Sequence, residues 1–166
     1  MRILFLFASL FLLSTAGCSQ TDPAVPTLED KIGQMLMVGF RGMEVTAEDP
    51  IVEDIQQLNL GGIILFDYDV PRQSPERNIE SPQQVRTLTG QLQSFSETLL
   101  LIGIDQEGGR VVRLKPKFGF PETVSAQYLG SLNNPDSTQH FAHQQAELIS
   151  SLGINVNFCA GGRSQH

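Results

Sequence analysis

Four apolar runs alternate along the chain with stretches whose apolar residues recur at helical spacing. Runs this apolar, with little polar alternation, are typical of parallel strands that are buried on both faces. They are Met35–Phe40, Gly61–Phe66, Leu99–Ile104 and Ile154–Phe158. The repeated order of strand and helix predicts a parallel α/β sheet built from βα units.

The stretches between these runs carry helix-start signals and apolar stripes. Thr27 and Asp30 have the spacing of a capping box, and Asp49-Pro50 and Ser81-Pro82 each place a capping residue before a proline. The expected stripes are Leu28, Ile32, Met35 and Leu36; Ile51, Ile55 and Leu58; and Val85, Leu88, Leu92 and Phe95 within a helix Gln83–Phe95. A further helix is predicted over Phe141–Leu152.

Length and charge narrow the possible fold and partners. The 166 residues include 11 basic and 18 acidic side chains, giving a formal net charge of −7. This balance argues against a nucleic-acid-binding module, which needs basic groups to neutralise phosphates. A complete (β/α)8 barrel typically takes about 250 residues, so a barrel in this chain would be incomplete.

The first residues resemble an export signal followed by a lipidation site. Residues 1–17 combine Arg2 with an apolar run that is short for a membrane-spanning helix, and then with small residues. Thr15-Ala16-Gly17-Cys18 resembles a bacterial lipobox, in which the cysteine is acylated. We therefore expect a lipoprotein signal peptide over residues 1–17 and lipidation of Cys18. The alternative is a plain secreted protein that is cut near Ala16.

The expected lipid anchor also predicts a location. Acyl chains on Cys18 would hold the chain at a membrane, with residues 18–27 as a short tether. Ser19 follows the cysteine where Asp could stand, which favours the outer membrane, facing the periplasm. Cys159 is the only other cysteine, so the sequence predicts neither a disulfide framework nor a thiolate metal site.

Asp105 is the first candidate for a functional residue. It stands where an apolar strand meets the glycine-containing loop Gln106–Arg110, at the edge of a parallel sheet where ligands bind. Gly108-Gly109 would let the backbone approach a ligand closely. Arg110 and Arg113 can return to pair with Asp105 or hold ligand oxygens. In the alternative interpretation, Asp105 caps the next segment and the arginines are solvated.

Other polar residues are expected to have ordinary surface roles. Asp67 and Asp69 follow the second strand at the same edge, but polar loop residues are more often solvated than ligand-binding. The Arg41-Gly42 turn is likewise expected to be an ordinary turn without a functional role. His140 and His143 lie three residues apart without a third ligand nearby, so surface positions are favoured over a metal site.

Several segments together resemble the N-terminal half of family 3 glycoside hydrolases, in the β-N-acetylhexosaminidase branch. They are Lys31–Met35, Leu60–Phe66, Ser81–Val85 with Leu88-Thr89, Ile104–Val111 and Gly153–Phe158. The resemblance runs in order over residues 28–158, and Asp105-Gln106-Glu107-Gly108-Gly109-Arg110 is its most specific block.

The resemblance implies a partial (β/α)8 barrel of the TIM type, with about four of eight βα units present. The implied activity is hydrolysis of terminal N-acetylglucosaminides of envelope glycans with retention, through a glycosyl-enzyme intermediate. The family's sugar-binding Asp and Arg correspond to Asp105 and Arg113. The implied partner is a carbohydrate, and no metal or organic cofactor is implied.

The family's catalytic groups do not correspond to residues of this sequence. Its Lys-His pair, its His/Asp acid–base loop and its nucleophilic Asp lie beyond the matching stretch, so no catalytic residue is assigned. We therefore expect the chain alone to be inactive. The competing interpretation is a non-catalytic envelope lipoprotein that binds glycan or a protein partner through the loop 105–113.

Residues 159–166 depart from the family pattern at once. After Asn157-Phe158 the family usually continues Ala-Pro-Val-Val-Asp, whereas this chain reads Cys-Ala-Gly-Gly-Arg-Ser-Gln-His. Removing one base from permissible codons for this tail yields Ala-Pro-Val-Val-Asp-Leu-Asn. We therefore expect an out-of-frame tail caused by a one-base insertion after Phe158. The alternative is a natural short protein, and resequencing the DNA across that codon distinguishes the two.

Overall fold

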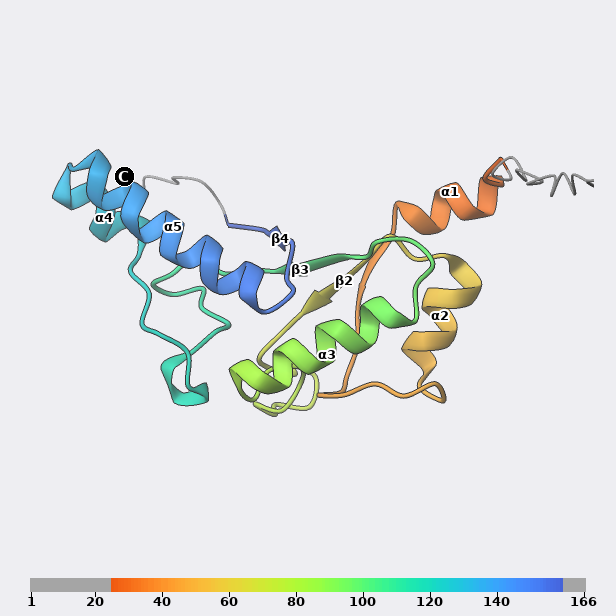
Figure 1. The fold of residues 1–166 in the computed structure, drawn as a ribbon. Coiled ribbons are helices and arrows are strands. Elements are labelled where there is room, and N and C mark those ends of the chain that lie inside the picture. The colour runs from red at the N-terminus through yellow and green to blue at the C-terminus, as the bar shows by residue number, and fades with distance from the viewer. Residues whose placement is uncertain (1–24, 160–166) are drawn as a thin grey trace, which may run out of the picture.

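The computed structural model describes residues 25–159 as a four-stranded parallel sheet flanked by helices (Figure 1). The strands are β1 (Met37–Gly39), β2 (Gly62–Leu65), β3 (Leu101–Ile104) and β4 (Val156–Asn157), in the spatial order β1-β2-β3-β4. The helices are α1 (Leu28–Gln34), α2 (Pro50–Leu58), α3 (Pro82–Ser94), α4 (Ala126–Leu132) and α5 (Pro135–Ser151), with a 3-10 turn η1 (Pro116–Phe118). The predicted parallel α/β sheet of βα units is confirmed, and each predicted strand contains an observed one.

The predicted signal peptide, Cys18 and residues 160–166 of the tail lie outside the described residues. Within residues 25–159, no helix has both the length and the apolar character needed to cross a bilayer.

Two of the predicted helix starts follow from local capping chemistry. Asp49 does not cap α2 with its side chain, because its carboxylate accepts hydrogen bonds from Thr46 instead. Thr27 Oγ1 accepts a hydrogen bond from Asp30 N at 3.1 Å, and the Asp30 carboxylate accepts one from Thr27 N at 2.9 Å. These hydrogen bonds form the predicted capping box, and the Thr27 hydroxyl lowers the pKa of Asp30 below its usual value. Ser81 Oγ likewise accepts a hydrogen bond from Gln84 N at the start of α3.

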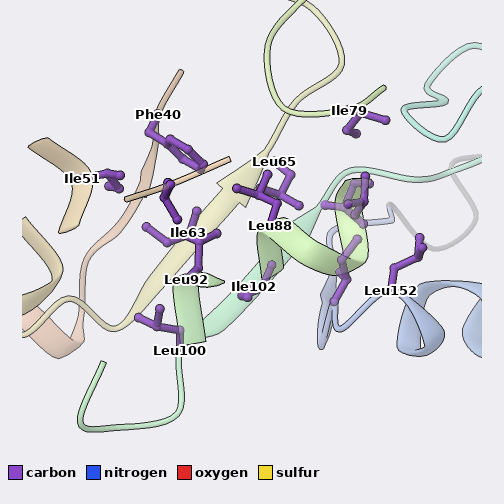
Figure 2. Packing of buried hydrophobic residues seen from close by; sticks show 14 of the residues in the cluster. Phe40, Ile51, Ile63, Leu65, Ile79, Leu88, Leu92, Leu100, Ile102 and Leu152 are labelled. Atoms are coloured by element: carbon purple, nitrogen blue, oxygen red, sulfur yellow. The ribbon is translucent and has the colours of Figure 1, made fainter. Parts of the chain in front are cut away.

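One face of the sheet forms the hydrophobic core. Ile63 and Leu65 of β2 and Ile102 of β3 are fully buried on this face. Leu88 and Leu92, from the predicted stripe of α3, lie against these strand residues in Figure 2 and are also fully buried. The apolar residues of α3 lie on one side of the helix, and alternate residues of each strand point to one face of the sheet. These two apolar surfaces therefore pack against each other.

The opposite face of the sheet is covered much less. The alternate strand positions Met37, Ile64 and Val156 are only partly buried, and Leu101 is exposed, as is Phe158 beyond β4. The expectation that the strands are buried on both faces is therefore wrong. Four strands form an open sheet, so the face that would line the inside of a closed barrel remains accessible.

The first helix also differs from its predicted packing. Its apolar residues Leu28 and Ile32 are exposed, and the buried residue is Gly33. A Cβ atom at Gly33 would overlap the Leu58 carbonyl oxygen, so α1 packs through its backbone against the end of α2. Gly61 N also donates a hydrogen bond to Gly33 O at 2.9 Å.

The predicted helix Phe141–Leu152 is the C-terminal part of the longer α5, and α4 was not predicted. Helices α4 and α5 lie toward the opposite end of the molecule from α1 and α2 (Figure 1). Thr89 Oγ1 of α3 donates a hydrogen bond to Leu152 O at 2.7 Å, which holds the end of α5 against the core.

Candidate functional site

Arg113 joins carboxylates that follow two neighbouring strands. Asp67 lies just beyond β2, and Asp105 directly follows β3. Arg113 Nη1 lies 3.3 Å from Asp67 Oδ1, and Arg113 Nη2 lies 3.3 Å from Asp105 Oδ2. Lys115 Nζ pairs with the other oxygen of Asp67. Arg113 therefore pairs with Asp105, one of the two roles expected for it, while Arg110 is exposed.

The loop between Asp105 and Arg113 is closed by the Gln106 side chain and by a backbone hydrogen bond. Gln106 is fully buried, and its Oε1 accepts hydrogen bonds from Arg113 N at 2.8 Å and Leu114 N at 3.1 Å. Glu107 N donates to Val111 O at 2.9 Å across the turn. These hydrogen bonds reverse the chain, and thereby bring the Arg113 side chain back toward the end of β3.

The glycine pair serves this turn in a way that the sequence did not indicate. Gly108 and Gly109 have φ values of +79° and +66°, which L side chains rarely adopt. A Cβ atom at Gly108 would overlap the Val124 carbonyl oxygen. The close approach is therefore to the chain's own residues 124–125, and the expected approach to a ligand is not what these glycines accommodate here.

The four charged groups differ in their access to solvent. The Asp67 side chain is 2% exposed, whereas those of Arg113, Asp105 and Lys115 are 27%, 29% and 38% exposed. Two carboxylates and two cations give the cluster no net formal charge. Its exposed part offers both hydrogen-bond acceptors and donors, which suits a neutral ligand with several hydroxyl groups.

A second buried carboxylate lies at the same edge. The Asp69 side chain is 1% exposed and receives two hydrogen bonds from Arg41, from Nε and from Nη2, the latter at 3.2 Å. These hydrogen bonds lower the pKa of Asp69 and raise that of Arg41. The expectation that Asp67 and Asp69 are solvated is therefore wrong, because each is buried against a cation from another segment.

Asn78 connects the loops that follow β1 and β2, and sequence reasoning missed it. The side chain is fully buried. Its Oδ1 accepts a hydrogen bond from Phe66 N at 3.1 Å, and its Nδ2 donates to Gly42 O at 2.9 Å. The neighbouring Arg77 guanidinium lies 4.5 Å from the centre of the Phe66 ring, a cation–π distance. Asn78 and Arg77 thus hold the loop after β2 against the loop after β1.

The two histidines of α5 are exposed, as their spacing suggested. His143 Nε2 lies 3.1 Å from Glu147 Oε1, one helical turn further on. Among residues 25–159, no group of three or more His, Cys, Asp or Glu side chains is arranged to hold a metal ion.

Comparison with known proteins identifies relatives of the chain. Residues 27–160 match the family described as "Glycosyl hydrolase family 3 N terminal domain". The chain is 33% identical over 129 residues to a beta-hexosaminidase of Nitrosomonas eutropha, and 37% identical over 129 residues to one of Methylobacillus flagellatus. Each match covers 74% of this chain and 33% of the relative. The chain therefore spans about a third of the length of these curated relatives.

Solved structures give the same relationship. A family 3 beta-N-acetylglucosaminidase from Paenibacillus superimposes with a TM-score of 0.70 at 35% identity, covering 81% of this chain and 24% of that one. NagZ from Neisseria gonorrhoeae, in complex with N-trifluoroacetyl-D-glucosamine, superimposes with a TM-score of 0.56 at 25% identity, covering 75% and 35%. The four strands and the helices that connect them correspond to part of the N-terminal barrel of these enzymes. The chain thus belongs to glycosyl hydrolase family 3.

Proposed function

We propose that the chain forms part of the sugar-binding face of a glycoside hydrolase that acts on terminal N-acetylglucosamine. Asp105 and Arg113 are the residues that contact sugar hydroxyls in this proposal. The observation that carries it is the Arg113 bridge between Asp67 and Asp105 at the carboxyl ends of β2 and β3. The relatives named beta-hexosaminidase and beta-N-acetylglucosaminidase support the choice of sugar.

The chemistry of the bridge fits recognition of neighbouring hydroxyls. The Asp105 carboxylate can accept hydrogen bonds from sugar hydroxyls, and the planar Arg113 guanidinium can donate to their oxygens. Because Asp67 is buried, it contributes by holding Arg113 rather than by touching a sugar. Envelope glycans, such as peptidoglycan fragments, are the proposed natural source of the sugar.

We propose further that the chain alone binds sugar without hydrolysing it. A retaining glycosidase needs a nucleophile and an acid/base group about 5–5.5 Å apart. Asp67, Asp69 and Asp105 all form ion pairs with basic side chains, an arrangement that suits oriented acceptors better than a proton-donating acid. Neither role is assigned to a residue of the described range. The alternative, a glycan-binding lipoprotein, shares this expectation for the isolated chain.

The proposal is tested by saturation-transfer NMR titration of the purified chain with N-acetylglucosamine. Arg113→Ala removes a charged hydrogen-bond donor, a change worth about 1.5–3 kcal/mol, so we expect at least tenfold weaker binding. Arg86→Ala, at an exposed arginine of α3 outside the site, is the matched control and should bind as the unsubstituted chain does. No binding by the unsubstituted chain refutes the proposed function. Release of aryl alcohol from an aryl β-N-acetylglucosaminide refutes the expectation that the chain is inactive.

We propose that Cys18 carries a lipid anchor that holds the chain at the outer membrane, facing the periplasm. The support is the lipobox-like Thr15–Cys18 after an export-type apolar run. Cys18→Ala should abolish the mass added by acylation and release the chain from the membrane fraction in a bacterial host. Cys159→Ala, at the only other cysteine, should leave both unchanged. An unmodified Cys18 in the mature protein contradicts the anchor.

A further inference from the structure

We propose that Lys115 is a third sugar-contacting residue, and that Asp67 is a positioning residue that holds Lys115 beside Arg113. The inference rests on the proposed function and extends its site. It begins from the position of Asp67, whose carboxylate binds one cation at each oxygen: Arg113 at Oδ1 and Lys115 at Oδ2.

Burial of Asp67 makes both partners necessary. A carboxylate that is 2% exposed loses most of its hydration, and this loss is offset only by close positive or hydrogen-bonding groups. Since the two oxygens have different partners, removing either cation leaves part of the buried charge uncompensated. Asp67 therefore fixes the Lys115 ammonium at a defined place next to the Arg113 guanidinium.

The backbone directs the two cations to the same side. Leu114 is fully buried, whereas the side chains of its neighbours Arg113 and Lys115 are partly exposed. The chain turns tightly at Leu114, where Lys115 N donates a hydrogen bond to Arg113 O at 3.1 Å, and both side chains reach the Asp67 carboxylate from this turn. Lys115 itself has extended dihedrals of φ −87° and ψ 147°. Pro116 follows at the start of η1 and restricts Lys115 to this extended region.

Lys115 retains donor capacity toward solvent. An ammonium group has three hydrogens to donate, and the hydrogen bond found for Lys115 Nζ in the described structure is the one to Asp67. The side chain is 38% exposed, more than that of Arg113. A ligand hydroxyl therefore has room to approach the ammonium.

The charge of the cluster supports the same assignment. Without Lys115, the Asp67–Arg113–Asp105 group would carry a net negative charge, and Arg113 alone would serve two carboxylates. Lys115 makes the group neutral, so Asp105 can accept from a sugar hydroxyl while the cations donate to others. Such a neutral set of donors and acceptors matches a polyol rather than an ion.

The test compares Lys115→Met with Lys117→Met in saturation-transfer titrations of the full chain with N-acetylglucosamine. Lys117 lies two residues further on, exposed over the Phe118 ring at 4.6 Å, and is the matched control. We expect about tenfold weaker binding for Lys115→Met, the loss of one charged hydrogen bond, and less than twofold change for Lys117→Met. Asp67→Asn, which keeps the shape but removes the charge, should also weaken binding.

Deoxy sugars separate a contact from a purely structural role. The titrations are repeated with 3-deoxy, 4-deoxy and 6-deoxy N-acetylglucosamine. If Lys115 donates to one hydroxyl, the sugar that lacks this hydroxyl should bind equally to Lys115→Met and to the unsubstituted chain. Unchanged affinity of Lys115→Met, or the same loss with every deoxy sugar, overturns the inference and leaves the proposed function standing. Absence of binding by the unsubstituted chain overturns both.

Discussion

Substitution of Asn78 by alanine should destabilise the fold by breaking the connection between two strand ends. The change leaves Phe66 N–H and Gly42 C=O without the hydrogen bonds at 3.1 and 2.9 Å. Phe40 O, a weaker partner at 3.4 Å, keeps a hydrogen bond from Arg77 Nε at 3.2 Å, so it adds little.

The size of the effect follows from the number of groups left unpaired. Each buried polar group without a partner costs about 1–3 kcal/mol, and entry of water into the space left by the amide reduces this cost. For two such groups we expect the free energy of unfolding to fall by about 2–4 kcal/mol. This is a large fraction of the 5–15 kcal/mol that is usual for a small domain.

Urea unfolding followed by circular dichroism measures this loss. Asn78→Asp keeps an acceptor for Phe66 N but places a carboxylate oxygen against Gly42 O, so it should also be destabilised. Gln83→Ala, at an exposed position of α3, is the control and should change the free energy of unfolding by less than about 0.5 kcal/mol. If the free energy of unfolding of Asn78→Ala lies within about 0.5 kcal/mol of that of the unsubstituted chain, the two hydrogen bonds do not stabilise the fold as argued.

Two further predictions concern pH and glycine. Because Arg41 lowers the folded pKa of Asp69 below its unfolded value of about 3.9, this carboxylate contributes stability above that pH and loses it as pH falls through the folded pKa. Urea midpoints measured from pH 6 to pH 2 should therefore fall more steeply for the unsubstituted chain than for Asp69→Asn, and parallel curves contradict this. Gly108→Ala should lower the melting temperature, since φ is +79° and a Cβ would overlap Val124 O, whereas Gly90→Ala on α3 meets no atom within 4 Å and should raise it. Equal shifts for both glycines would contradict the geometric argument.

The parts of the fold that local chemistry determines were predictable from sequence. Thr27 and Ser81 act on helix ends only three residues away, so their spacing was sufficient to predict the caps. The Asp105–Arg113 pair could also be predicted from sequence, because the two residues are only eight positions apart and a single loop joins them. The short α4 was missed because its seven residues are too few for a clear helical period, although Ser125 Oγ caps its start by accepting a hydrogen bond from Tyr128 N.

The rest of the site depends on segments that are far apart along the chain. Asp67 pairs with Lys115 across 48 residues, and Asp69 pairs with Arg41 across 28, so no local pattern indicated their burial. The exposure of Leu101 has a different cause. An apolar run shows that a strand can be buried on both faces, but whether the second face is covered depends on how many strands enclose it.

Because Arg113 joins carboxylates from two consecutive βα units, separating the ends of β2 and β3 must break one of its two ion pairs. A ligand that binds Asp105 and Arg113 together binds only the joined arrangement, so it raises the free energy of opening by RT ln(1 + c/Kd), where c is the ligand concentration. Backbone amide hydrogens beside Asp67 and Asp105 should then exchange more slowly as sugar concentration rises. Hydrogen exchange at these strand ends would thereby report occupancy of the site even in a chain that turns over no substrate.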